Sequence, residues 1–152
     1  MNRVEVGAQE LPLPAWAERS GAFVLTVLEK LGRDGWDLSI CYCGDSFIKT
    51  LNARYRNRDE ATDILSFPQG EDFPSSLARE YRPAGDIVIS LDSLAENAGF
   101  FGVSMDEELR RLLIHGILHL DGMDHETNEK TEPMLRLQEE ILDNLAGERI
   151  IA

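Results

Sequence analysis

The sequence MDEELRRLLIHGILHLDGMDH, from Met105 to His125, carries the strongest local signals in the chain. Ser104 precedes it, and Glu107 follows three residues after that serine, which is the capping-box pairing that starts helices. Gly122 indicates where the helix ends, because glycine adopts a positive φ at helix C-termini without strain. The stretch therefore predicts a helix from Met105 to Leu120, followed by a glycine turn.

All the histidines of the chain, His115, His119 and His125, fall in this stretch. Four residues apart on a helix, the first two are separated by about 40° of rotation and about 6 Å of rise, so both imidazoles can reach one ion. The turn at Gly122 would bring His125 toward the same ion. Three protein ligands plus water are typical of catalytic zinc, whereas structural zinc is usually closed by four. We predict a hydrolytic centre with one Zn²⁺, although Ni²⁺ or another divalent metal also suits imidazole.

Three carboxylates accompany these histidines, at Asp121, Asp124 and Glu126. Carboxylates commonly accept a hydrogen bond from the second ring nitrogen of a metal-binding histidine. The alternative is an acidic loop that faces solvent. The sequence leaves both readings open.

The spacing H-x-x-x-H-x-x-G-x-x-H matches the metzincin peptidases, in which a glutamate directly after the first histidine is the general base. Here that position is Gly116. Without the carboxylate, the pattern keeps the metal geometry of these peptidases and lacks their proton acceptor. Met134 could imitate the metzincin methionine turn, but we expect a core methionine.

Strands and helices alternate along the rest of the chain. The patterns predict strands at 2–7, Trp36–Tyr42, Thr62–Phe67 and Asp86–Ser90. They predict helices at Pro14–Leu31, Gly44–Tyr55, with Asp45 or Ser46 marking its start, and Leu91–Phe101. A last helix runs from Thr127 or Asn128 to about Leu145 and is interrupted or begun anew near Pro133.

This order of elements predicts an α+β or mixed α/β fold, with one mixed sheet of about four strands covered by helices. A chain of 152 residues fits one domain, which we place at 1–152. The segment from Pro68 to Ala84, rich in Pro, Gly, Ser and charge, reads as an exposed loop.

The composition excludes several classes of protein. With 43% hydrophobic and 28% charged residues, the chain has no run near the roughly 20 apolar residues that a membrane helix needs. Its N-terminus lacks the pattern of a signal peptide, so we expect a cytoplasmic protein. Cys41 and Cys43, spaced i, i+2 in a predicted strand, share a face in poor geometry for a disulfide, and we expect reduced core residues.

The formal net charge of -13 argues against broad binding to nucleic acid, because Lys and Arg supply most of the affinity for phosphate backbones. A local basic cleft, or a partner that delivers the substrate, would remove this objection. Arg54, Arg56 and Arg58 lie in one segment, at the predicted end of a helix. They either complement the helix dipole or place one guanidinium in an active cleft, where its planar fork could hold a phosphate.

The chain resembles the YbeY family of metal-dependent endoribonucleases, which are associated with ribosomal RNA maturation. Three segments carry the resemblance, in the order of the family: LNARYRNRDEATDILSFP at 51–68, GDIVIS from Gly85 and HGILHLDGMDH from His115. The departures are the acidic loop 69–82 and the strongly negative charge.

The resemblance implies a zinc site at His115, His119 and His125, and a role for Arg56 in substrate binding or catalysis. It implies a single-strand-specific endoribonuclease of 16S rRNA 3′-end maturation and ribosome quality control, with rRNA and the ribosome or its associated proteins as partners. RNA as the substrate rests on this resemblance, since residue spacing does not distinguish RNA from another phosphodiester. The attacking group, either water or the ribose 2′-hydroxyl, is left open.

Two other functions compete with this one. A noncatalytic ribosome-assembly factor would use zinc to fix its fold and arginines to bind RNA. A peptidase would need a base other than the residue at Gly116. A three-ligand site, with its open coordination position, favours the hydrolase, because a purely structural site would not require that position.

Overall fold

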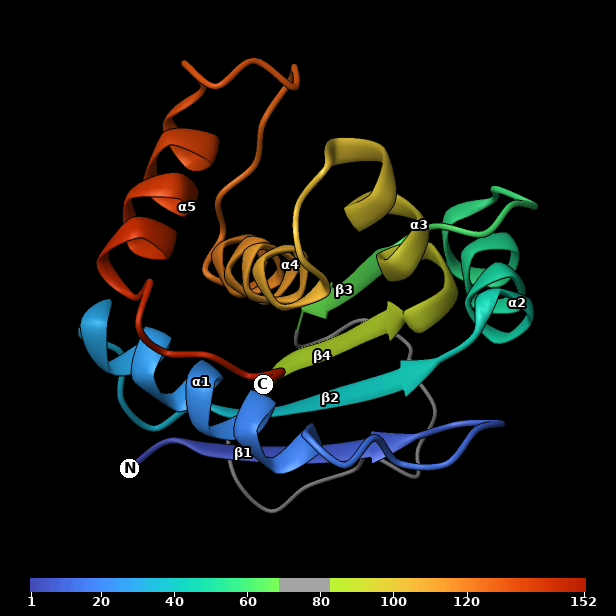
Figure 1. The fold of residues 1–152 in the computed structure, drawn as a ribbon, viewed down its shortest axis with the longest axis horizontal. Coiled ribbons are helices and arrows are strands. Elements are labelled where there is room, and N and C mark those ends of the chain that lie inside the picture. Colours follow the sequence, from blue (N-terminus) through green and yellow to red (C-terminus); the bar gives the residue numbers. More distant parts are fainter. Residues whose placement is uncertain (69–82) are drawn as a thin grey trace.

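The computed structural model describes residues 1–68 and 83–152 (Figure 1). Its elements follow the predicted order of strands and helices. They are β1 (Arg3–Ala8), α1 (Ala17–Lys30), β2 (Asp37–Cys43), α2 (Asp45–Arg56), β3 (Ile64–Pro68), β4 (Pro83–Ser90), α3 (Leu91–Phe101), α4 (Met105–Leu120) and α5 (Pro133–Asn144).

The strands form one sheet in the order β1-β2-β4-β3. β1 pairs with β2 and β2 with β4 in parallel, whereas β3 runs antiparallel along β4. Ile64 lies opposite Ile89 and Phe67 opposite Asp86 in that antiparallel pair. The predicted α+β fold with one mixed four-stranded sheet is therefore confirmed.

Alternation along the strands divides the core into two layers. On β4, Ile87 and Ile89 belong to the cluster that includes the buried face of α4, whereas Val88 between them packs with Ile48 and Leu51 of α2. Successive strand side chains point to opposite faces, so α4 and α2 cover opposite faces of the sheet. Figure 1 shows α4 lying across the sheet between α5 and α3.

Among the helices that the structure describes, α4 has the most buried residues. Its apolar residues Leu109, Leu113, Ile114, Ile117 and Leu118 are all fully buried. They contribute to one cluster with residues of α1, α5 and the sheet. Burial of each such side chain is worth about 1.5–3 kcal/mol, so the helix that carries two of the histidines is firmly held.

Several predicted boundaries were wrong, for local reasons. Helix α2 begins after Gly44 and has no side-chain cap from its own first turn; Asp92 of α3 instead accepts a hydrogen bond from the amide of Asp45, at 2.9 Å. Helix α5 begins at Pro133, whose fixed φ suits the first turn, so the predicted new start near Pro133 is confirmed. The start at Thr127 or Asn128 was wrong, because Thr127 instead forms a turn with Glu132.

Three other elements also start at positions that differ from the prediction. β1 starts one residue later and α1 three residues later, whereas β4 starts three residues earlier, at Pro83. The pairing of Gly85 with Pro68 extends the sheet past Asp86. The rest of the predicted exposed loop, residues 69–82, lies outside the described residues. Among the helices that are described, none is long and apolar enough to cross a membrane.

The two cysteines lie on the sheet as free thiols. Cys43 is fully buried, and Cys41 is half-buried beside it. Burial raises the pKa of Cys41 to about 11 and that of Cys43 to about 12, so both stay protonated and unreactive at neutral pH. They are core residues, as expected.

Gly85 is required where β3, β4 and the end of α4 meet. Its φ is +148°, and a Cβ there would lie 2.3 Å from the carbonyl oxygen of Phe67 and 2.7 Å from a methyl group of Leu120. We expect Gly85→Ala to lower the free energy of unfolding by about 2–3 kcal/mol, because both the backbone conformation and the neighbours oppose a side chain. Urea denaturation measures this, with Gly99→Ala as the control: Gly99 lies in α3 with open space around it. Equal stability of the two variants would contradict the prediction.

Candidate metal centre

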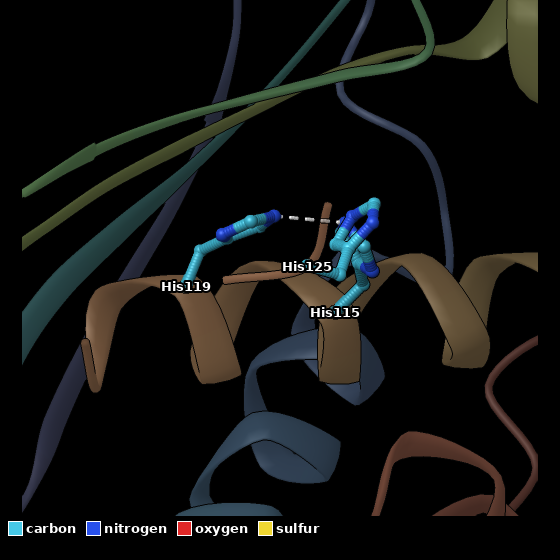
Figure 2. Close-up of side chains that lie close together, drawn as sticks. All are labelled: His115, His119 and His125. Atoms are coloured by element: carbon cyan, nitrogen blue, oxygen red, sulfur yellow. Dashed lines mark hydrogen bonds between the residues drawn. The ribbon is translucent and has the colours of Figure 1, made fainter. Parts of the chain in front are cut away.

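The three histidines converge at the end of α4. His115 and His119 come from the helix, and His125 comes from the loop after it (Figure 2). Each offers one ring nitrogen, and these atoms lie within 4.8 Å of one another. The group could hold a metal ion.

A glycine turn brings the third histidine back. The amide of Gly122, whose φ is 93°, donates to the carbonyl of His119 at 3.0 Å, and Met123 donates to the carbonyl of Leu118 at 3.0 Å. Arg33 then clamps the turn through two bonds to the carboxylate of Asp121, at 2.8 and 2.9 Å. The loop therefore leaves the helix in a defined direction.

An oxygen atom faces the Nδ1 atom of each ring. Gln138 Oε1 lies 2.7 Å from Nδ1 of His115, and the carbonyl oxygens of Met123 and Thr127 lie 3.1 and 2.8 Å from Nδ1 of His119 and His125. Because oxygen acceptors require a proton on Nδ1, the neutral form of each ring carries its lone pair on Nε2.

The Nε2 atoms of His115 and His119 face each other at 3.0 Å (Figure 2). Two nitrogens at that distance need either a proton or a metal ion between them, because two bare lone pairs would repel each other. Three imidazoles whose Nδ1 atoms are each held by an oxygen acceptor form a donor set that suits divalent transition metals. The residues present therefore fit such an ion.

The carboxylates expected near the rings do something else. Asp121 pairs with Arg33, and Asp124 accepts a hydrogen bond from the backbone amide of His125 at 2.8 Å. Glu126 is exposed. The reading in which these side chains orient the ring nitrogens was wrong, because a glutamine and two backbone carbonyls already occupy those positions.

Burial of the first two rings favours their neutral form. It lowers the pKa of His115, against a smaller opposing effect of the Gln138 hydrogen bond, and it lowers the pKa of His119, against the Met123 carbonyl. Histidine ligates metals as the neutral imidazole. The environment therefore keeps both rings ready to bind at neutral pH.

A cleft of about 480 Å³ opens beside His115 and His119. β3 and the turn after α4 line its other sides, and Arg56 lies at its wall. The Arg56 guanidinium donates to the carbonyl of Ser66 at 2.8 Å and lies 4.8 Å from the ring centroid of Phe67. One arginine thus shares the cleft with the histidines.

The end of α2 explains why only one arginine of the segment lies there. The helix stops at Arg56 because Asn57 adopts the left-handed conformation, with φ 59°. The buried Asn52 side chain then donates to the carbonyl of Glu60 at 2.9 Å and holds the loop. Arg54 and Arg58 are exposed and lie outside the cleft lining, against Tyr55 and Glu60.

Gly116 faces the sheet, against Ile87 and Ile64. A Cβ at this position would lie 3.0 Å from Ile87 Cδ1 and 3.1 Å from Ile64 Cδ1. Glycine therefore lets α4 approach the sheet closely, and it supplies no side chain that could act as a base. Met134 is fully buried in the core, as expected.

Introducing the metzincin glutamate tests this reading. We expect Gly116→Glu to destabilise the protein by about 2–4 kcal/mol, because it forces a carboxylate into an apolar helix–sheet contact. Thermal unfolding would be compared with that of Gly99→Glu, which adds the same side chain at an exposed position of α3. A folded Gly116→Glu variant as stable as that control would disprove the packing role.

The family pattern described as Endoribonuclease YbeY matches residues 8–146. The chain belongs to the YbeY family. Endoribonuclease YbeY of Treponema denticola is 50% identical over 120 residues, covering 79% of this chain and 77% of that protein. The Treponema pallidum protein of the same name is 45% identical over 142 residues, covering 93% and 89%.

A solved structure agrees with the fold. The solution structure of TM1509 from Thermotoga maritima superposes with a TM-score of 0.65 at 27% identity, over 95% of this chain and 90% of that one. The YbeY family resemblance read from three segments is confirmed over nearly the whole chain.

Sequence reasoning missed two residues of this YbeY-family site. Gln138 contacts His115 from 23 positions away, and Arg33 contacts Asp121 from 88. Local spacing carries no signal for either contact. A lone glutamine near the middle of an amphipathic helix was the available hint for Gln138.

Proposed function

We propose that this chain is a zinc-dependent endoribonuclease, folded as one metallohydrolase domain over 1–152. It acts in the cytoplasm on single-stranded rRNA, in 16S rRNA 3′-end maturation and ribosome quality control, together with the ribosome or its associated proteins. The observation that carries the proposal is the shared cleft of Arg56, His115 and His119. The names of its relatives support RNA as the substrate.

His115, His119 and His125 would hold the metal through their Nε2 atoms. A bound Zn²⁺ supplies a Lewis acid that lowers the pKa of water and polarises a phosphoryl oxygen. The protein supplies orientation: Gln138 and two carbonyls fix the three rings before the ion arrives. Ni²⁺ or another divalent metal would fit the same donors.

Arg56 would bind the scissile phosphate and stabilise the negative charge that develops on it. Its guanidinium is oriented by the Ser66 carbonyl and by the ring of Phe67, so little freedom is lost when a phosphate binds. The guanidinium fork matches the geometry of two phosphate oxygens.

The overall charge of -13 fits this local arrangement. Acidic surfaces repel phosphate backbones at long range, so RNA that lacks a good fit to the Arg56 cleft is bound weakly. A cleft of about 480 Å³ has the volume of a small-ligand site, which favours a few nucleotides of an extended strand over a duplex.

A panel of matched substrates tests the proposal. Zinc-loaded protein would be incubated with a single-stranded rRNA fragment, its duplex, the same sequence as DNA, and an unstructured peptide. We expect internal cleavage of the single strand, which stops on chelation and returns with zinc. The product ends identify the attacking group, since attack by water leaves no cyclic phosphate.

Other outcomes would replace the proposal. Binding of the RNA fragment without cleavage would support a noncatalytic assembly factor. Cleavage of the peptide that stops on chelation would support a peptidase.

A further inference from the structure

His115 differs from the other two histidines in what holds its ring. Backbone carbonyls orient His119 and His125, whereas the partner of His115 is the side chain of Gln138 on α5. Gln138 is buried, with 7% of its surface exposed. A backbone carbonyl points one way, but an amide can present either its oxygen or its NH₂ group to the ring.

The neighbouring Glu139 decides which way the amide points. Gln138 Nε2 donates to Glu139 Oε2 at 3.1 Å. An ionised carboxylate only accepts, so the NH₂ group must face Glu139 and the amide oxygen must face His115. Nδ1 of His115 then has to carry the proton, and Nε2 is left to bind the ion.

Arg111 in turn fixes Glu139. Its Nε donates to Oε2 at 3.0 Å and one of its terminal nitrogens donates to Oε1 at 3.2 Å, which is the two-pronged geometry of a strong arginine–carboxylate pair. Burial alone would raise the pKa of Glu139, but the hydrogen bonds from Arg111 and Gln138, together with the positive charges of Arg111 and Lys130, outweigh burial and lower that pKa. Glu139 therefore stays an acceptor.

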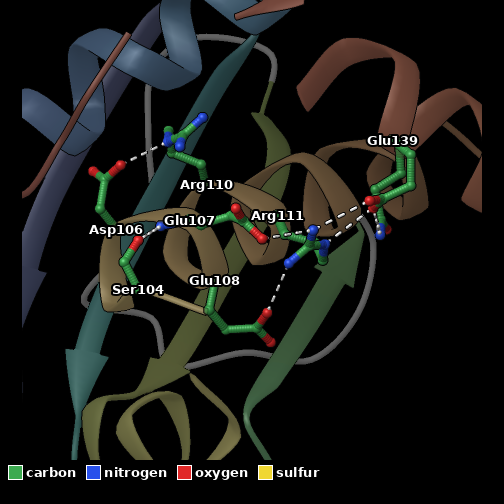
Figure 3. Close-up of polar contacts among 8 residues, drawn as sticks. Ser104, Asp106, Glu107, Glu108, Arg110, Arg111 and Glu139 are labelled. Carbon is green, nitrogen blue, oxygen red and sulfur yellow. Dashed lines mark hydrogen bonds and ion pairs between the residues drawn. The ribbon is translucent and has the colours of Figure 1, made fainter. Parts of the chain in front are cut away.

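Arg111 is itself held from two sides. It lies four residues before His115 on α4 and bonds Glu107 and Glu108 of the same helix, at 3.1 and 3.2 Å. Figure 3 shows its guanidinium between these two carboxylates and Glu139 of α5. The chain of contacts runs from Arg111 through Glu139 and Gln138 back to His115, so it closes on the helix where it began.

We infer that Gln138 is a positioning residue that sets the tautomer and ring direction of His115, and that Glu139 and Arg111 fix its amide for this purpose. The inference rests on the proposed metal-binding role of His115. Partners of this kind typically change metal affinity by about 10–100-fold when they are removed.

Cobalt binding is the first test, because the visible spectrum of bound Co²⁺ reports coordination without an activity assay. Gln138→Met keeps the length of the side chain and loses the amide. We expect its Co²⁺ affinity to fall about 10–100-fold, while Gln138→Glu, which keeps an oxygen acceptor, stays within a few-fold of wild type. Glu140→Met, on the exposed side of α5, is the matched control and should bind as wild type does.

The tautomer of His115 is the second test, and it needs no metal. In ¹⁵N-histidine-labelled metal-free protein at about pH 8, above the usual histidine pKa, NMR should find the His115 proton on Nδ1 in wild type and in Glu140→Met. In Gln138→Met it should be found on Nε2 to a large extent. Unfolding temperatures of the metal-free variants show that each one is folded.

A folded Gln138→Met variant that binds Co²⁺ as tightly as wild type would overturn the inference, and so would one that keeps its His115 proton on Nδ1. If wild type itself binds no Co²⁺, the proposed metal function fails. The tautomer measurement then still decides whether Gln138 positions the ring.

Discussion

Replacing His119 with alanine will lower the affinity of the protein for zinc by about 10²–10³-fold, since it removes one of the three proposed ligands, and such sites have a total binding energy of the order of 10 kcal/mol. Its ring lies between the helix and the turn, with Nε2 facing His115 at 3.0 Å and Nδ1 at the Met123 carbonyl. RNA cleavage at limiting zinc should fall with occupancy.

Zinc affinity would be measured by competition with a chromophoric chelator. Glu126→Ala, in the exposed loop beside His125, is the control, and we expect it to bind zinc as wild type does. His119 is partly exposed, so its loss should leave the metal-free fold intact. Wild-type affinity in a folded His119→Ala variant would exclude His119 as a ligand.

Arg56→Ala will lower the rate constant for RNA cleavage by about 10²–10³-fold while zinc affinity stays unchanged, the loss typical when one donor to a developing negative charge is removed. Arg56 lies at the wall of the histidine cleft, and its guanidinium lies over the ring of Phe67 on β3. Arg56→Lys should recover only part of the rate, because an ammonium group cannot hold two phosphate oxygens in one plane.

Arg58→Ala is the matched control, since Arg58 is exposed and pairs with Glu60 at 3.6 Å. Single-turnover kinetics at saturating zinc separate the chemical step from metal binding and product release. If Arg56→Ala and Arg58→Ala slow cleavage equally, the arginines act through general charge and Arg56 has no special place in the reaction.

The convergence of the histidines could be expected from sequence because it depends on local geometry. His115 and His119 share a helix face through their spacing, and Gly122 provides a turn that other residues would strain to form. Contacts between distant segments gave no such signal. The Gln138 and Arg33 contacts, and the place of Arg56 in the same cleft, depend on how α5, α1 and α2 pack around the site.

The same distinction holds for the fold. Strand and helix order followed from periodicity, and a mixed sheet of about four strands could be predicted from it. Strand order could not, because β4 lies between β2 and β3 through pairings that no local pattern encodes. Boundaries failed where a distant residue decides them, as at the start of α2, where Asp92 of another helix satisfies the amide of Asp45.

The central claim is that one metal ion, held by the three histidines, enables RNA cleavage in the Arg56 cleft. The most direct measurement titrates zinc into metal-stripped protein and follows occupancy and the single-turnover cleavage rate of a single-stranded rRNA fragment in the same samples. We expect the rate to rise in proportion to occupancy and to level off at one zinc per chain. Cleavage that is already complete in stripped protein, or that does not change as the site fills, would contradict the claim.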